Sequence, residues 1–596
     1  MDTRAKFYDE NHDLVDLRGE DDSAHFFSAL LTRSDTALKT ALTRIDSSVR
    51  IWASQAPLND ELAAELLQCH LPTVLRLSRQ CPVEEVRSSF SKLLADLEEH
   101  GTPVPTPLYA GASSFMPTPK VQAVGSGDDQ VSRLFMDAFL YDGRVSNMTQ
   151  VMGDHPAYLE CHIRCQHYLM HGDGPLPFEW RTMIAVLAAS RHRCGVLVRV
   201  LLKDFQDQQG DSSWLRGIDH LPRKLQNLLE VNKLLAHRPW LVNHKHMEML
   251  LQPGPDSWSM GELMHALVLL AHWHAVSGFV FGCGVNPELD MPEGHSFTCT
   301  SQSTGDRHGA ASRSEQTTSA PAASSANGSN GVHRSGTAAA AVAAAAPAAI
   351  DGTIAPPTDK GVMRVASRED VGELAEKMKE LNAEEEEEDS SSGEDQLTNF
   401  QQIYGGSSEN GDGSTSCSGP CPEMLLPFLD EPSFSHENFA ERGEGSGIHP
   451  FRLYDYCWED HGFSLVNRLY SDIGPLLDEK FSCVASLTYN KVGDVENIDT
   501  SPFRRAVFNY IHCIKGIFHD DYSYRQVNQL VSRELKTYVK MITCFPERVT
   551  PAEFQCLDMF KPSEQVHINF LLLEARLQAE LLYALRALNA YITRRS

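Results

Sequence analysis

The sequence predicts an all-α protein with two helical regions joined by a long disordered segment. Apolar residues recur at helical spacing through most of residues 131–285 and again from residue 425 onwards. The stretch between them is rich in Ser, Gly, Ala and Glu, and such a composition buries too little apolar surface to offset the entropy lost on ordering. The length of 596 residues exceeds the roughly 250–300 at which one hydrophobic core stops growing, so we expect more than one domain.

The charge composition limits the partners of the protein. The chain has 52 Lys and Arg against 80 Asp and Glu, a net charge of −28, which argues against a surface that binds nucleic acid or anionic membranes. The amino terminus lacks the apolar region of a secretory signal, and no stretch approaches roughly 18 uninterrupted apolar residues. Fourteen cysteines without CxxC pairs are typical of reduced thiols. We therefore expect a soluble intracellular protein without membrane insertion, located in the cytoplasm, with the nucleus open as a second location.

Residues 1–125 are predicted to be an amino-terminal leader. Helical periodicity between Ala24 and Glu99 predicts two to four short helices. Five prolines between Gly101 and Lys120 then predict an extended connection.

Residues 126–286 are predicted to be the first helical domain, beginning with a helix that Ser126 or Asp128 caps. Within this domain the stretch from Gly174 to Phe205 reads as one helix, with Cys194 on the face turned towards the core.

A second long helix of this domain, Gly261–Gly278, is apolar on most of its circumference, which implies burial on nearly all sides. His272 and His274 lie two residues apart in it, on different faces of the helix. We interpret them as core histidines with satisfied hydrogen bonds.

Residues 287–424 are predicted to be a disordered linker, which includes an alanine tract and an acidic run. Residues 367–383 are an exception, since they carry an amphipathic helical pattern. Two interpretations stay open: this helix docks on a folded domain, or it forms only transiently. The apolar positions of the pattern are Val371, Leu374, Met378 and Leu381.

Residues 425–596 are predicted to be the second helical domain. The last helix is long and apolar, but charged residues interrupt it too often for a membrane span. These charged residues are Glu574, Arg576, Glu580 and Arg586.

A run of thiols and imidazoles precedes Cys194 in the first domain. The pattern lacks a second Cys/His pair at a recognisable spacing, which a tetrahedral metal site would need, so we expect no metal and no other cofactor. The run consists of Cys161, His162, Cys165, His167 and His171.

Two interpretations of Cys194 stay open from the residues alone. Arg191, His192 and Arg193 precede it, and nearby positive charge stabilises a reactive thiolate. The alternative is a small buried hydrophobe, because no proton relay follows one turn later.

The second domain carries a candidate ligand site. Hydroxyl-bearing residues Thr488, Tyr489 and Thr500 flank a loop that leads into Arg504. Such hydroxyls, with one arginine for a carboxylate and one glutamate for an ammonium group, suit a free amino acid. Further on, Asp520 and Asp521 form an acidic turn, which is equally consistent with an exposed helix cap and with a partner contact.

Several long motifs in the right order resemble the sestrin family. The resemblance covers roughly residues 131–285 and 436–593. It implies two similar helical halves related to the alkyl-hydroperoxidase-D fold, with a disordered segment between them. The motifs are KLQNLLEVNKLLAHRPWLV, SWSMGELMHALVLLAHWH, WEDHGFSLVNRLY, NYIHCIKGIF, DDYSYRQVNQL and VHINFLLLEARLQAELLYALRAL.

The resemblance also implies a function. Sestrins are stress-responsive inhibitors of TOR complex one that bind the GATOR-two subcomplex, and in some members leucine releases that contact. The first half of sestrins has also been assigned a peroxide-reducing activity. The resemblance therefore implies an amino-acid-regulated inhibitor of TOR signalling, with a thiol-dependent hydroperoxide reductase as the alternative.

The family's reactive cysteine matches Cys194 in this sequence. The tyrosine expected two residues later is Val196, and the histidine expected seven residues later is Leu201. The proton relay of the family is therefore missing, which argues against catalysis.

The family's leucine pocket matches six residues here. Arg504 is expected to bind the carboxylate of the ligand and Glu564 its ammonium group. Three neighbouring positions depart from the family, because Lys491 replaces a lid threonine, Phe503 a leucine and Leu557 a tryptophan of the pocket floor. The six matching residues are Thr488, Tyr489, Thr500, Arg504, Glu564 and His567.

The family's contact with GATOR-two matches three residues. Asp520 and Asp521 supply its acidic pair, and Ser259 of the first half supplies a hydroxyl. If both halves contribute to one surface, ligand-dependent closure of the lid is the expected switch.

Overall fold

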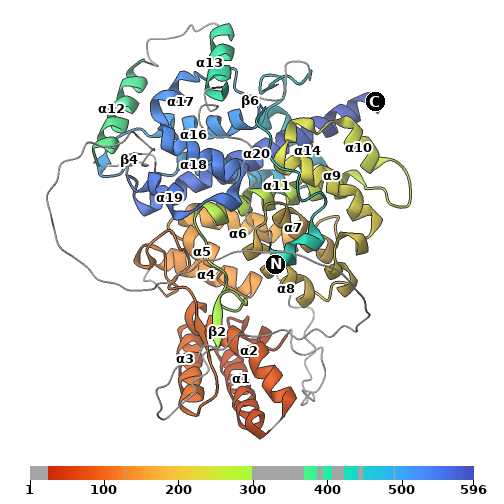
Figure 1. Ribbon diagram of the computed structural model, residues 1–596, viewed down its shortest axis with the longest axis vertical. Helices are drawn as coiled ribbons and strands as arrows, with labels where there is room; N and C mark the ends of the chain where they lie inside the picture. The colour runs from red at the N-terminus through yellow and green to blue at the C-terminus, as the bar shows by residue number, and fades with distance from the viewer. Residues whose placement is uncertain are drawn as a thin grey trace, which may run out of the picture. The chain divides into compact units, whose positions relative to one another are not determined.

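The computed structural model describes residues 25–58, 60–125, 128–297, 368–384, 393–405, 422–439, 447–488 and 490–595. Helices make up nearly all of its regular structure, and the strands are two or three residues long (Figure 1). The all-α class predicted from the periodicity is therefore confirmed. Most of the predicted linker, together with Ser126 and Tyr489, lies outside the described residues.

The leader contains three α-helices within residues 25–58 and 60–125, the part that the structure describes, and this number lies in the predicted range. Ser34 and Asp60 cap the first two, because their side chains accept hydrogen bonds from the backbone N–H groups of Ala37 and Ala63. Arg76 of the second helix then forms a buried ion pair with Asp290 at 2.9 Å. The elements are α1 (Asp35–Gln55), α2 (Glu61–Gln80), α3 (Glu84–Glu99) and β1 (Pro105–Pro107).

Strand β2 (His295–Phe297) pairs antiparallel with β1 of the leader. Leu289 and Met291, just before β2, are buried. Packed structure therefore continues to Phe297, beyond the predicted boundary at residue 286, because these residues fill the junction with the leader.

The first half contains eight helices within its described residues. Asp128 caps the first one, as one of the two predicted choices, by accepting from the N–H groups of Gln130 and Val131 at 2.9 and 3.0 Å. The helices are α4 (Asp129–Asp142), α5 (Asn147–Met152), α6 (Pro156–His171), α7 (Phe178–Arg191), α8 (Gly195–Asp207), α9 (Arg223–His237), α10 (His244–Leu251) and α11 (Met260–Gly282).

The prediction of one helix from Gly174 to Phe205 was wrong. Helix α7 ends at Arg191 and α8 begins at Gly195, with Arg193 between them in the left-handed region at φ 55°. The apolar period continues across the break because both helices bury apolar residues in the same core, so periodicity alone did not reveal the turn.

The second half contains short strands as well as helices. The hairpin β4 (Lys491–Val492) and β5 (Val495–Glu496) is antiparallel, whereas β3 (Phe451–Arg452) and β6 (Ile517–Phe518) pair in parallel. The helices are α14 (Phe463–Leu469), α15 (Ile473–Ser486), α16 (Ser501–Ile514), α17 (Arg525–Leu530), α18 (Arg533–Cys544), α19 (Pro551–Phe554) and α20 (Pro562–Arg595).

The described part of the predicted linker contains two further α-helices, α12 (Arg368–Glu384) and α13 (Gly393–Gly405). Helix α12 packs against β5, α16 and α17, and Figure 1 shows it beside β4. All four apolar positions of its pattern are buried, with Met378 fully inaccessible. Of the two interpretations left open, the structure therefore has the docked helix.

The two halves pack together through α11 and α20, which lie side by side in the interior (Figure 1). Every residue of α11 from Leu263 to Val280 is buried, as its apolar circumference predicts. Helix α11 is long and apolar enough to cross a membrane by length and composition, yet it forms the centre of the core.

The ends of the two halves repeat one arrangement. The residues that directly follow α9 and α18 have nearly equal dihedral angles, Arg238 at φ −142°, ψ 61° and Phe545 at φ −141°, ψ 55°. Each is followed by a 3₁₀ helix that starts with proline, Pro239–Leu241 and Pro546–Arg548, and then by a helix with a capping box and a long final helix. The capping boxes pair Asn243 with His246 and Thr550 with Glu553.

Charged side chains are buried where α20 meets the first half. Glu580 accepts from Nε of Arg576 at 2.9 Å and contacts Nδ1 of His274 at 2.7 Å. Nearer the start of α20, Glu574 forms an ion pair with Lys480 at 2.9 Å and accepts from the hydroxyl of Tyr158. Each carboxylate thus binds a group from α11 or α6, so these charges link the two halves.

His272 and His274 differ from each other. His274 contacts Glu580 through one ring nitrogen and Asn232 through the other, as expected for a satisfied core histidine. His272 has no hydrogen-bond partner for either ring nitrogen among the described residues, and its ring stacks on that of His162. The interpretation of two satisfied histidines therefore holds for His274 only.

Candidate functional site

The predicted amino-acid site lies where α15 ends and α16 and α20 begin. Thr488 follows α15, Thr500 precedes the first residue of α16, and Arg504 lies one turn into α16. Glu564 lies in the first turn of α20, with His567 almost one turn later. Arg504, Glu564 and His567 are buried, so residues far apart in sequence meet beneath the surface.

His567 joins the loop after α15 to α20. Its Nε2 lies 2.8 Å from the carbonyl oxygen of Val484, and its Nδ1 lies 2.7 Å from the hydroxyl of Thr488. Because a carbonyl only accepts, Nε2 carries the proton and Nδ1 accepts from Thr488. Burial lowers the pKa of His567 to about 3, so the ring is neutral at physiological pH.

Arg504 and Thr500 bind the same end of α15. Nε of Arg504 donates to the carbonyl oxygen of Ala485 at 2.7 Å, and its guanidinium also donates to the hydroxyl of Thr500. That hydroxyl in turn donates to the carbonyl oxygen of Thr488 at 2.9 Å, where the backbone is left-handed at φ 50°. The last carbonyls of α15, which lack partners within the helix, are therefore bound by predicted site residues.

Glu564 holds the β4–β5 hairpin. Its carboxylate oxygens accept from the N–H group of Gly493 at 3.0 and 2.9 Å, and one also accepts from the N–H group of Lys561 at 3.0 Å. Gly493 has φ +54°, and a Cβ atom there would lie 2.9 Å from Val371 of α12. The hairpin turn is thus enclosed between Glu564 and α12, a contact that periodicity did not predict.

The three departures from the family surround this site differently. Lys491 is exposed on β4. The pKa of His155 from the first half is lowered mainly by burial, and the charge of Lys491 adds to this effect. Phe503 and Leu557 are buried, and the ring of Phe503 lies 5.6 Å from that of Phe560. The apolar part of the site is therefore more aromatic at Phe503 and smaller at Leu557 than in the family pattern.

Cys194 is fully buried before the first residue of α8. Burial raises the pKa of its thiol to about 12, so the sulfur stays protonated at physiological pH. The neighbouring basic groups point elsewhere: Arg191 donates to the carbonyl oxygen of Asp430, and His192 contacts Arg576. Burial lowers the pKa of His192 well below its usual value, so this ring is neutral. The basic residues that suggested a reactive thiolate thus serve contacts with the second half.

The predicted partner residues come from two elements. Asp520 accepts from Nε of Arg452 at 2.7 Å and from the N–H group of Tyr454 at 3.0 Å, whereas Asp521 is exposed. Tyr454 is 84% exposed, so a large aromatic side chain lies beside the acidic pair. Ser259 is exposed and caps α11, accepting from the N–H group of Glu262 at 3.2 Å.

Two groups within the described residues bring three metal-binding side chains together. One consists of Cys457, Asp460 and His461, and the other of Glu230, Asp430 and Glu431. The second group surrounds Lys233, which forms ion pairs with all three carboxylates, so its acidic charge is already compensated.

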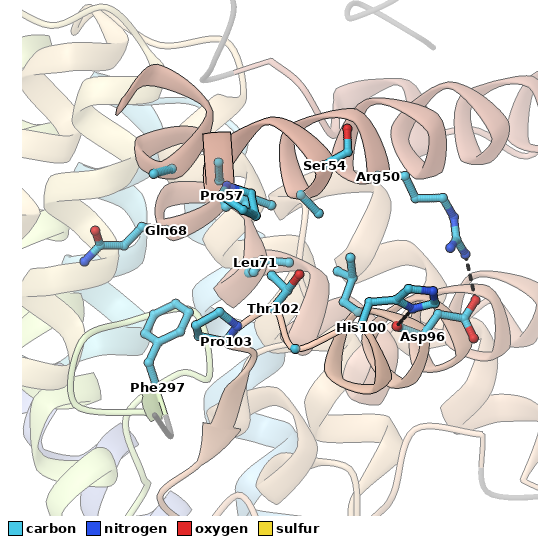
Figure 2. A pocket seen from close by; sticks show the side chains of 16 residues that line it. Arg50, Ser54, Pro57, Gln68, Leu71, Asp96, His100, Thr102, Pro103 and Phe297 are labelled. Carbon is cyan, nitrogen blue, oxygen red and sulfur yellow. Dashed lines mark hydrogen bonds and ion pairs between the residues drawn. The ribbon is translucent and has the colours of Figure 1, made fainter. Parts of the chain in front are cut away.

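A cavity of about 800 Å³ lies in the leader, between α1, α2 and α3 (Figure 2). Its wall includes Leu67, Leu71 and Phe297, and the ion pair between Arg50 and Asp96 lies at its rim at 2.9 Å. Among the lining residues that the structure describes, none belongs to the sites predicted from the sequence.

Comparison with known proteins gives consistent matches over most of the chain. Residues 111–592 match the family model described as PA26 p53-induced protein (sestrin). The chain is 40% identical to Sestrin-1 of Xenopus laevis over 505 residues, which cover 83% of this chain and 95% of that protein. It is 41% identical to Sestrin-3 of Mus musculus over 500 residues, covering 82% and 94%. It is 40% identical to Sestrin-2 of Homo sapiens over 486 residues, covering 81% and 91%.

Proposed function

The chain belongs to the sestrin family, and we propose that it is a non-catalytic regulator that binds a free amino acid and inhibits TOR complex one signalling through the GATOR-two subcomplex. The observation that carries the proposal is the pair of buried, oppositely charged side chains, Arg504 and Glu564, at the starts of α16 and α20. An amino acid has a carboxylate and an ammonium group that match such a pair.

The proposed ligand is leucine or a similar apolar amino acid. Phe503 and Leu557 supply apolar surface near the charged pair, which favours an apolar side chain on the ligand. The ammonium group would take over carboxylate contacts that Glu564 makes with Gly493, so binding would act directly on the β4–β5 hairpin. Such a ligand-dependent change of the hairpin is the proposed switch.

A thermal-shift titration with leucine tests the amino-acid site. Wild-type protein should unfold at a higher temperature as the leucine concentration rises. At a concentration of one hundred times Kd, leucine should add about 2.7 kcal/mol to the free energy of unfolding. Glu564→Gln keeps an acceptor for Gly493 but removes the charge that binds ammonium, so its titration should be flat. Glu380→Gln, an exposed change on α12, is the matched control and should respond like wild type. If leucine, isoleucine, valine and methionine all leave the unfolding temperature of wild-type protein unchanged, the protein does not sense these amino acids. The remaining interpretation would then be a structural scaffold without a ligand.

A pull-down of GATOR-two tests the partner separately. The double variant Asp520→Ala and Asp521→Ala should lose binding, because it removes both carboxylates of the acidic turn. Asp219→Ala, an exposed carboxylate on the first half, should bind as wild type does. Undiminished binding by the double variant would contradict this assignment of the partner surface.

The alternative function, hydroperoxide reduction by Cys194, has less support. The thiol is buried, its pKa is raised to about 12, and Val196 and Leu201 stand where the family has its relay. We expect purified wild-type protein and Cys194→Ser to consume cumene hydroperoxide at equal rates. A rate that falls in Cys194→Ser would restore the enzymatic interpretation.

A further inference from the structure

Helices α6 and α15, one from each half, pack against each other in antiparallel directions. Arg164 of α6 donates to both carboxylate oxygens of Glu479 on α15 at 2.9 Å. Further along α6, the hydroxyl of Tyr168 donates to the carbonyl oxygen of Ser471, just before α15, at 2.9 Å. A later residue of α6 therefore contacts an earlier residue in or near α15, as expected for two antiparallel helices.

The same register brings two cysteines together. Cys161 precedes Arg164 by three residues, and Cys483 follows Glu479 by four, so each lies on the face that carries the ion pair. Because α6 and α15 are packed together, the two thiols face each other, and a hydrogen bond between them is the largest influence on the pKa of each. Both cysteines are free. One belongs to the first half and the other to the second.

We propose that Cys161 and Cys483 form a redox-sensitive pair that hydroperoxides oxidise to a disulfide between the two halves. The helix packing provides the close approach that a disulfide needs. Cys483 is partly exposed and is the point of entry, whereas Cys161 is buried behind it. The ion pair beside them, with Arg164 and Glu479 about half exposed, places the pair near the surface.

The chemistry needs only the two thiols and a hydroperoxide. The sulfur of Cys483 attacks the peroxide bond, which breaks to give a sulfenic acid on Cys483 and release an alcohol, or water from hydrogen peroxide. The sulfur of Cys161 then attacks the sulfenic sulfur, water leaves, and the disulfide forms. Two thiols lose two electrons in total, and the peroxide gains them.

The electrostatics of the pair favour this order of attack. The hydrogen bond from Cys161 lowers the pKa of Cys483, and the same contact raises the pKa of Cys161. Cys483 is therefore the better nucleophile of the two. Cys194 differs from it, because Cys194 is buried and has a raised pKa.

The disulfide would lie beside the amino-acid site. Val484 and Ala485 immediately follow Cys483, and their carbonyl oxygens bind His567 and Arg504. Oxidation would therefore restrain the end of α15 to which the site residues attach. The disulfide itself does not depend on the proposed function, whereas its effect on leucine binding rests on it, so the two are measured separately.

Peptide mapping tests the disulfide. Reduced full-length protein is treated with hydrogen peroxide, its remaining thiols are alkylated, and it is digested with trypsin without reductant. We expect residues 145–164 linked to residues 481–491, since each peptide contains one cysteine. The linked mass should vanish with dithiothreitol and be absent from Cys161→Ser and from Cys483→Ser.

Cys194→Ser is the matched control and should retain the linked peptide. Wild-type protein whose oxidised Cys483 is found as a sulfinic acid, or linked to Cys165, would overturn the proposal without any variant. Unfolding temperature gives a second readout: oxidation should raise it in wild type and leave it unchanged in Cys483→Ser. A leucine titration of oxidised and reduced wild type then measures the coupling alone.

Discussion

At the scale of single residues, the buried carboxylates of α20 form polar links between the halves. Glu580 is inaccessible to solvent and contacts both Arg576 and His274. From the sequence these charges indicated only that the last helix does not span a membrane. Their partners were not predictable, because His274 lies 306 residues from Glu580 and only the packing of α11 on α20 brings them together.

Removing one of these charges should destabilise the protein strongly. Glu580→Ala leaves Arg576 buried without its carboxylate partner, and breaking a buried ion pair in this way costs about 3–5 kcal/mol. Glu580→Gln keeps acceptor capacity for the guanidinium and should lose less. Urea denaturation followed by circular dichroism measures the free energy of unfolding.

The control for this experiment is Glu380→Ala, an exposed change that should alter stability by less than about 0.5 kcal/mol. Equal stabilities of Glu580→Ala and the control would show that the buried network contributes little.

At the scale of elements, α12 determines how the β4–β5 hairpin is held. The apolar period identified its buried face correctly, down to Val371 and Met378. Its docking site was beyond prediction, because the contact depends on the absence of a side chain at Gly493, which lies over a hundred residues further along the chain. Helices α7 and α8 show a limit of the same method. Their apolar pattern is continuous, so it did not reveal that one helix ends and another begins between Arg191 and Gly195.

Truncating the core of α12 should loosen the hairpin. Met378 is fully buried, and a Met→Ala change in such a position costs about 2–5 kcal/mol. For Met378→Ala we expect faster amide hydrogen exchange in α12 and in residues 491–496, because the two pack on each other. Lys379→Ala, exposed on the same helix, should exchange as wild type does. Faster exchange in α12 with an unchanged hairpin would contradict the coupling.

At the scale of the whole molecule, helical periodicity predicted the all-α fold class and the order of the helices along the chain. It did not predict that the two halves pack against each other through α11 and α20. Helical spacing reports which face of a helix is apolar, but α11 is apolar on nearly all sides and α20 buries charged residues as well as apolar ones, so the pattern names no partner. The amino-acid site depends on that union too, since Nε2 of His155 in the first half donates to the carbonyl oxygen of Ser563, next to Glu564, at 2.7 Å.

The buried histidines should make the protein sensitive to mild acid. In the unfolded chain imidazole binds a proton near pH 6.5, but in the folded chain burial prevents this until about pH 3 or 4. The unfolded state therefore binds more protons, and the free energy of unfolding should fall as the pH falls from 7 towards 4. The residues are His70, with a pKa lowered to about 4, and His162, His265, His519 and His567, with a pKa lowered to about 3.

Two buried carboxyl groups act in the opposite direction. The pKa of Glu288 is raised to about 7 and that of Asp204 to about 6, mainly by burial, so both take up protons in the folded state as the pH falls. These two carboxyl groups are fewer than the five histidines. The free energy of unfolding should therefore still fall as the pH falls. Unfolding temperatures at pH 7.5, 6.5 and 5.5 and constant ionic strength measure it. A constant unfolding temperature over this range would contradict the prediction.

The packing of α11 on α20 also has a consequence for synthesis. Helix α11 is complete at residue 282, but its partner begins only at residue 562. Those roughly 280 intervening residues take about 14–56 s to translate at roughly 5–20 residues per second. During that interval α7 and α9 can already pack on α11, but the face of α11 that packs against α20 lacks its partner, so we expect this apolar face to attract ribosome-associated chaperones. The order of translation thus leaves the central core open until the last helix has been made.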